Sequence, residues 1–146
     1  MGKKPITSAQ VKTLRNNVKE KPLQELLLNL GVDLMLRSSD LLNLKVSDVV
    51  SDTGKVKTEV MVKQKKTKKS TLRIPLSDYS IKTIQKHLME RSRDDFIFKG
   101  QKSYKGKPIS VIQYTRIVKQ WMEMLGVDSM DYSSHSMRKT KPTVIY

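Results

Sequence analysis

Residues 23–36 read LQELLLNLGVDLML and form the most apolar stretch of the chain. Apolar side chains would occupy most faces of a helix built from this stretch, so such a helix has no face suited to water. A domain packs its other elements around a buried element of this kind. We therefore expect residues 23–36 to form a central buried helix.

Shorter helical signals lie on both sides of this stretch. Residues 7–19 begin with Thr7 and Ser8, which are both good N-caps, and continue with amphipathic spacing. On the other side, Ser38 is a plausible N-cap for a short third helix. The sequence thus predicts three helices in its first third.

The middle of the chain changes to strand-like alternation. Residues 56–62 place valine or threonine at every second position, and residues 71–75 alternate again before Pro75. A turn signal at residues 52–54 precedes the first of these segments. Together they predict a β-hairpin whose tip is rich in lysine.

Three more helices are expected after the hairpin. The first begins at Ser77 or Asp78, the second runs from Pro108 to Gly126, and the third follows Ser133 or Ser134. Their expected apolar faces are Ile81, Ile84, Leu88 and Met89 in the first, and Ile109, Val111, Ile112, Ile117, Val118, Trp121 and Met122 in the second. We expect one α+β domain spanning residues 1–146, mainly helical, with a small antiparallel β-ribbon of two to three strands.

Charge indicates the partner. Twenty-nine Lys and Arg residues oppose fourteen Asp and Glu residues, giving a net charge of +15. Such an excess attracts polyanions, and nucleic acid is the usual one because phosphate neutralisation releases counterions. Aromatic residues make up only 5%, which argues against single-strand binding by base stacking.

The composition also limits where the protein works. There is no cysteine, which excludes disulfides and Cys-based zinc sites and is consistent with a reducing cytoplasm. The sequence contains neither a run of about 18 apolar residues nor an apolar signal segment. We expect a cytoplasmic, nucleoid-associated protein with no membrane partner.

The densest charge lies in and around the hairpin. Eight cations and one anion, Glu59, occur between Lys55 and Arg73. A two-stranded ribbon can enter a DNA groove, where its lysines meet phosphates. The expected DNA-binding residues are Lys63, Lys65, Lys68, Lys69 and Arg73. The alternative is a solvated hairpin whose charge only maintains solubility.

Two arginines have candidate partners nearby in sequence. Arg37 directly follows the apolar stretch, three residues before Asp40, and Arg138 lies three residues after His135. On spacing alone, Arg37 and Asp40 could simply form a structural ion pair. A second possibility is phosphoryl transfer, in which two guanidinium groups bind phosphate oxygens while other groups move protons.

Three segments resemble motifs of the tyrosine recombinase (phage integrase) family. Residues 31–50, GVDLMLRSSDLLNLKVSDVV, resemble the motif around the first catalytic arginine. Residues 65–76, KKTKKSTLRIPL, resemble the lysine-bearing hairpin, and residues 135–140, HSMRKT, resemble the His-x-x-Arg box. The three occur in the family's order, so the resemblance covers nearly the whole chain.

The resemblance implies a catalytic role for each matching residue. Arg37 and Arg138 would hold the scissile phosphate, and Lys66 would protonate the leaving 5′ oxygen, with Lys65 and Lys68 as alternatives. His135 would act in proton transfer or donate a hydrogen bond to the phosphate, and Asp40 would orient Arg37 or its surroundings. The family reaction cuts and rejoins double-stranded DNA through a 3′-phosphotyrosyl link, without a metal or another cofactor.

The family pattern continues beyond this sequence. Its nucleophilic tyrosine would lie about three dozen residues after Arg138, whereas Tyr146 is only eight residues away and matches the apolar part of a helix. We expect a catalytic domain that is incomplete at its C-terminus, lacks the N-terminal core-binding domain and is inactive alone. The full-length form would act as a tetramer on DNA.

Two other functions remain open. A non-enzymatic module could bind duplex DNA through the same basic ribbon, with its Arg and His residues in structural roles. An RNA-binding or ribosome-associated protein could carry the same charge.

Overall fold

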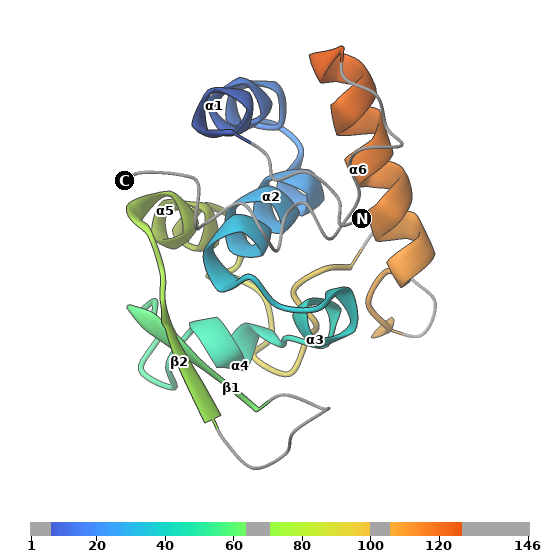
Figure 1. Ribbon diagram of the computed structural model, residues 1–146. Helices are drawn as coiled ribbons and strands as arrows, with labels where there is room; N and C mark the ends of the chain where they lie inside the picture. Colours follow the sequence, from blue (N-terminus) through green and yellow to red (C-terminus); the bar gives the residue numbers. More distant parts are fainter. Residues whose placement is uncertain (1–6, 64–70, 100–105, 127–146) are drawn as a thin grey trace.

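A computed structural model describes residues 7–63, 71–99 and 106–126 (Figure 1). Helices dominate these residues, and two strands form one small sheet. The elements are α1 (Ser8–Asn17), α2 (Pro22–Leu34), α3 (Ser38–Leu42), α4 (Val46–Val49), β1 (Glu59–Lys63), β2 (Thr71–Pro75), α5 (Asp78–His87) and α6 (Val111–Leu125). The predicted fold class, mainly helical α+β with a small antiparallel ribbon, is confirmed.

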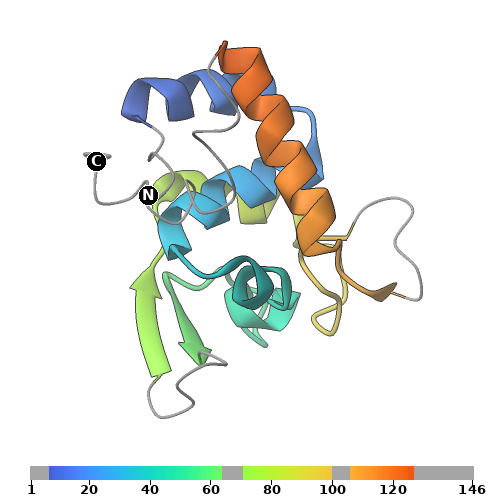
Figure 2. The ribbon, with the colours of Figure 1, turned by 45° about the vertical axis from the view of Figure 1, so that its right-hand side comes forward.

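Helix α2 lies at the centre of the molecule. It contacts α1, α5 and β2, and Figures 1 and 2 show the other helices arranged around it. Every residue from Leu26 to Leu34 is buried. Pro22 fits the first turn because its missing N–H would have no helical partner there. None of the described helices is long and apolar enough to cross a membrane.

Helix α2 ends two residues earlier than the sequence suggests, at a left-handed residue. Met35 has φ 52° and ψ 32°, and its N–H donates to the carbonyl of Gly31 at 3.4 Å. Among the described residues it is the only non-glycine with positive φ. The turn ends the helix and sends the chain through Leu36 to Arg37.

Replacing Met35 with valine is expected to lower the free energy of unfolding by about 1 kcal/mol or more, because a β-branched side chain tolerates the left-handed conformation poorly. Urea denaturation measures the change. Met61→Val is the matched control, since Met61 is 57% exposed on a strand, where valine is favoured. Equal effects of the two substitutions would contradict the proposed strain at Met35.

Two short helices follow Arg37. The N-cap of α3 is Arg37, not Ser38 as its hydroxyl had suggested. Sequence patterns did not predict α4, whose four residues are too few to show helical periodicity. Its first turn is closed by Asp48, whose carboxylate accepts the Lys45 N–H at 2.8 Å. This bond gives Asp48, which lies near the end of the 31–50 motif, a structural role.

The two strands form an antiparallel hairpin. Its register pairs Glu59 with Pro75 and Lys63 with Thr71. Strand β2 has the predicted bounds, whereas β1 starts three residues later than predicted because Val56 forms only an isolated bridge with Val50. In Figures 1 and 2 the hairpin projects from the end of the molecule opposite α1.

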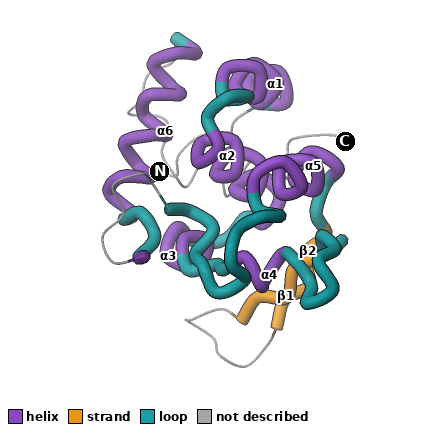
Figure 3. Tube along the Cα trace, turned by 180° about the vertical axis from the view of Figure 1, so that it is seen from behind, coloured by secondary structure: helices purple, strands orange, loops and turns teal. Residues whose placement is uncertain are grey.

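The last two described helices complete the core. Ser77 caps α5 as predicted, and α6 ends at Gly126, which has φ 73°. However, α6 begins at Val111 after an N-cap at Ser110, not at Pro108. The predicted apolar faces were partly wrong, since Met89, Val111 and Ile112 are 42%, 42% and 66% exposed. Figure 3 shows α6 beside α1 and α3, both of which it contacts.

Candidate functional site

Arg37 lies on a short link between two well-packed helices. The flanking Leu36 and Leu41 are 5% and 1% exposed, whereas the arginine side chain is exposed. Its carbonyl accepts the Leu41 N–H at 2.9 Å, and its side chain makes no capping bond. The fold therefore fixes the backbone of Arg37 and leaves its guanidinium available to a ligand.

Asp40 is buried in the first turn of α3, with 7% exposure. The ion pair suggested by its spacing from Arg37 does not form: no described carboxylate lies within ion-pair distance of the Arg37 guanidinium. A carboxylate in the first turn of a helix interacts favourably with the positive end of the helix dipole. The structural reading of Arg37, as half of a local pair, is therefore wrong.

The hairpin contacts two helices that lie close to Arg37 in sequence. Strand β2 contacts α2, which leads into Arg37, and β1 contacts α4, which follows α3. Arg73 lies on β2 opposite Met61, and its Nη1 is 4.0 Å from Glu59 Oε1. Both side chains are well exposed, so this pair contributes little to stability and leaves Arg73 accessible.

Several predicted site residues lie outside the described part of the chain. Lys63 ends β1, but only its backbone is described. The others are Lys65, Lys66, Lys68, Lys69, His135 and Arg138. Their roles stay predictions, and so does the convergence of Lys66, His135 and Arg138 on Arg37.

His87 has a structural partner. Its Nε2 lies 2.6 Å from Glu25 Oε1, and the two side chains are 11% and 13% exposed. Lys86 adds an ion pair to the same carboxylate at 3.4 Å. These contacts join α5 to α2, so His87 is not a candidate for proton transfer to DNA.

The two described tyrosines are a packing residue and a surface residue, as expected. Tyr114 is 1% exposed, and burial raises the pKa of its phenol. Tyr79 is 52% exposed, and the Arg15 guanidinium lies 3.7 Å from the centre of its ring. Tyr104 and Tyr132 lie outside the described residues. Neither Tyr114, in the core, nor Tyr79, stacked with Arg15, suits a nucleophile.

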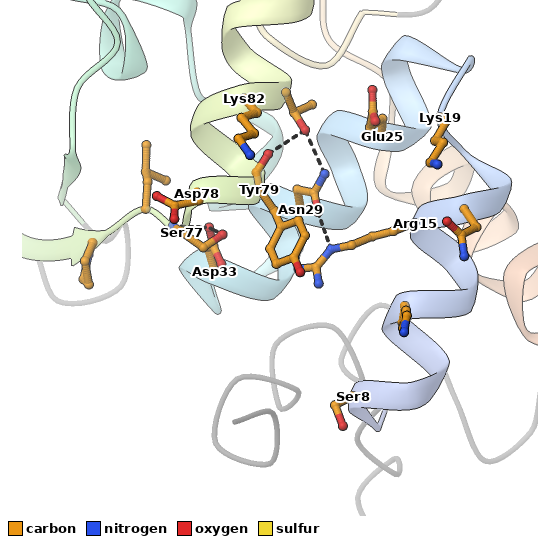
Figure 4. A pocket seen from close by; sticks show the side chains of 15 residues that line it. Ser8, Arg15, Lys19, Glu25, Asn29, Asp33, Ser77, Asp78, Tyr79 and Lys82 are labelled. Carbon is orange, nitrogen blue, oxygen red and sulfur yellow. Dashed lines mark hydrogen bonds between the residues drawn. The ribbon is translucent and has the colours of Figure 1, made fainter. Parts of the chain in front are cut away.

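A groove of ≈ 1050 Å³, which the sequence did not predict, lies between α1, α2 and α5 (Figure 4). Arg15 Nε donates to Asn29 Oδ1 at 2.8 Å, and Asn29 Nδ2 donates to Thr83 Oγ1 at 2.9 Å. Asp33 lies one turn further along α2. The signal in the sequence was two polar residues, Asn29 and Asp33, four apart within the otherwise apolar stretch 26–34 of α2.

The described residues show no metal centre. Across residues 7–63, 71–99 and 106–126, no group of three or more His, Asp or Glu side chains is arranged to hold a metal ion. Among these residues, the exposed guanidinium groups of Arg37 and Arg73 are the candidate phosphate ligands.

The fold matches solved recombinase structures. The chain superposes on XerA recombinase with a TM-score of 0.73 at 14% identity, covering 97% of this chain and 50% of that one. XerH site-specific recombinase bound to difH substrate gives 0.70 at 17% identity, covering 94% and 41%. The Tn1549 transposon integrase in complex with circular intermediate DNA gives 0.63 at 17% identity, covering 94% and 52%. The chain thus spans about half the length of these proteins.

Sequence comparison identifies the family. No curated protein matches the chain at a significant level. The pattern of the phage integrase family matches residues 4–146, which include all three motifs and nearly the whole chain. The chain therefore belongs to the phage integrase family.

Proposed function

We propose that this chain is the DNA-binding catalytic domain of a site-specific recombinase. The observation that carries the proposal is Arg37: a buried framework holds its backbone, no described carboxylate neutralises it, and it follows the helix that contacts the hairpin. An exposed guanidinium on a fixed backbone, in a protein that also carries a basic ribbon, suits a DNA phosphate. The family and the DNA complexes of similar proteins support duplex DNA as the partner.

The proposed reaction is a transesterification. A tyrosine oxygen bonds to phosphorus while the bond to the 5′ oxygen breaks, and Lys66 gives that oxygen a proton. Arg37 and Arg138 stabilise the charge on the non-bridging oxygens. His135 takes part in proton transfer. Asp40 acts indirectly, through the first turn of α3.

The reverse attack, by a 5′-hydroxyl of another strand, rejoins the DNA and frees the tyrosine. No energy source is needed, because one phosphodiester replaces another. Assembly of the whole protein into a tetramer on DNA and a cytoplasmic, nucleoid-associated location belong to the same proposal.

We assign the nucleophile to residues that would follow Tyr146 in a longer form. Residues 1–146 are therefore expected to form no covalent adduct with a nicked suicide duplex that carries the target site, and Tyr146→Phe is expected to behave identically. Denaturing gel electrophoresis detects the adduct. An adduct that disappears in the Tyr146→Phe variant would contradict this assignment.

The enzymatic proposal is tested with a longer protein, in which residues 1–146 are joined to a segment that carries the nucleophilic tyrosine. This form is expected to yield the adduct, and Arg37→Ala to abolish it. An extended form that binds the duplex but gives no adduct would favour the alternative, a non-enzymatic module with a basic ribbon.

A further inference from the structure

A single buried carboxylate fastens the hairpin to the central helix. Asp33 is 0% exposed, and its Oδ2 accepts hydrogen bonds from the N–H and the hydroxyl of Ser77, both at 2.8 Å. The hydroxyl of Ser80 donates to the same oxygen. Ser77 Oγ also accepts the Ser80 N–H at the start of α5. We call Asp33, Ser77 and Ser80 the carboxylate anchor.

The position of the anchor links the two parts of the proposed site. Ser77 comes two residues after the last residue of β2, so its bonds fix the point where the chain leaves the hairpin. Asp33 lies on the last turn of α2, four residues before Arg37. The anchor therefore determines where one strand of the hairpin lies relative to the helix that presents Arg37.

A buried carboxylate packs two elements together less favourably than an apolar side chain, because its charge loses hydration. Burying a charge requires compensation, and apolar residues of similar volume often stabilise a core equally well. Hydrogen bonds to an ionised group are roughly twice as strong as neutral ones, and their directions are defined. Three donors on one oxygen hold β2, α5 and α2 in one arrangement, which an apolar contact would not specify.

A second polar link provides an internal comparison. Asn29 and Thr83 connect the same two helices about one turn further from the hairpin. Thr83 also donates to the carbonyl of Tyr79 at 2.7 Å. Figure 4 shows Asn29 and Asp33 on α2 facing the helix that carries Tyr79. The Asn29–Thr83 link joins α2 to α5 without touching the exit of β2.

We propose that Asp33 is a positioning residue, which sets the separation between the hairpin and Arg37 so that both can reach the same stretch of DNA backbone. The effect of Asp33 on DNA binding rests on the proposed function, but its effect on the position of the hairpin can be tested without DNA.

The structural test uses electron paramagnetic resonance distances. The sequence has no cysteine, so spin labels attach only at introduced ones. Suitable positions are Met61→Cys on β1 and Ser39→Cys on α3, both exposed. Asp33→Asn is expected to broaden or shift the distance distribution because a neutral amide oxygen accepts weaker hydrogen bonds than a carboxylate oxygen. Thr83→Val, the matched control, is expected to leave it unchanged.

Two outcomes would overturn the structural part: an unchanged distribution in Asp33→Asn, or the same broadening in Thr83→Val. If Asp33→Asn does not fold, Ser80→Ala replaces it, since this variant removes one bond and keeps the carboxylate. Ser80→Ala is then expected to broaden the distribution, and no broadening would overturn the proposal.

The functional test measures duplex affinity by fluorescence anisotropy. Asp33→Asn is expected to weaken binding about fivefold, and Thr83→Val less than about twofold. Equal weakening by both variants would overturn the positioning role. A displaced hairpin with unchanged affinity would instead contradict the proposed function, because the hairpin and Arg37 would then not act together on DNA.

Discussion

Raising the salt concentration about fourfold, from roughly 50 to 200 mM, is expected to weaken duplex DNA binding by about 500-fold. The reason is counterion release at the hairpin. Lys63, Lys65, Lys66, Lys68 and Lys69 are five cations within seven residues. If each neutralises one phosphate, the slope of log affinity against log salt is about −4.5.

Fluorescence anisotropy of a labelled duplex measures this slope. Changing the four tip lysines, at positions 65, 66, 68 and 69, to glutamine is expected to make the slope shallower by about 3.6. The control removes the same charge from exposed lysines elsewhere in the protein, namely Lys12 on α1, Lys19 just after α1, Lys82 on α5 and Lys119 on α6. Equal changes in the two variants would show that charge alone, rather than the hairpin, binds DNA.

Replacing Leu30 with alanine is expected to lower the free energy of unfolding by about 3 kcal/mol. Leu30 is 0% exposed at the centre of α2, where its removal leaves a cavity that the surrounding helices cannot fill. Urea denaturation followed by circular dichroism measures the loss.

The control for this cavity is Met61→Ala, at an exposed position on β1. It is expected to change stability by less than about 0.5 kcal/mol. A comparable loss in both variants would contradict the central place of α2 in the core.

The central helix was predictable because burial leaves a direct compositional signal. Its C-terminal end was not, since Met35 adopts a left-handed conformation for which glycine or asparagine is the usual signal. Tertiary packing, rather than local preference, selects the end at this residue. The apolar face of α6 was predicted only in part for a related reason: Ile112 looks like a core residue in sequence but lies in an exposed first turn.

Among the short elements, one strand was predicted with its correct bounds, whereas the other strand and α4 were not. Strand β2 matched because its alternation ends at Pro75, which cannot donate to a ladder. Strand β1 was overextended, since Val56 continues the alternation beyond the paired residues. Helix α4 buries Val46 and Val49, but four residues are too few to show a periodic apolar face in sequence, and the Asp48 bond that closes its first turn gives no such pattern.

One part of the candidate site could be predicted from the sequence and another part could not. Arg37 could be singled out because a motif and an abrupt change from apolar to charged sequence coincide there. The carboxylate anchor could not be predicted, because Ser77 and Ser80 lie 44 and 47 residues after Asp33 in sequence. Asp33 within an apolar helix indicated only that some buried partner exists.

The central claim, that Arg37 and the hairpin lysine act on the same phosphate, is tested most directly by a double-mutant cycle in duplex affinity. Arg37→Ala and Lys66→Ala are combined, and Arg37→Ala is combined separately with Arg116→Ala on α6 as the control. The first pair is expected to show a coupling of about 1 kcal/mol, and the control pair to be additive within about 0.5 kcal/mol. Additive effects of Arg37→Ala and Lys66→Ala would contradict the shared phosphate.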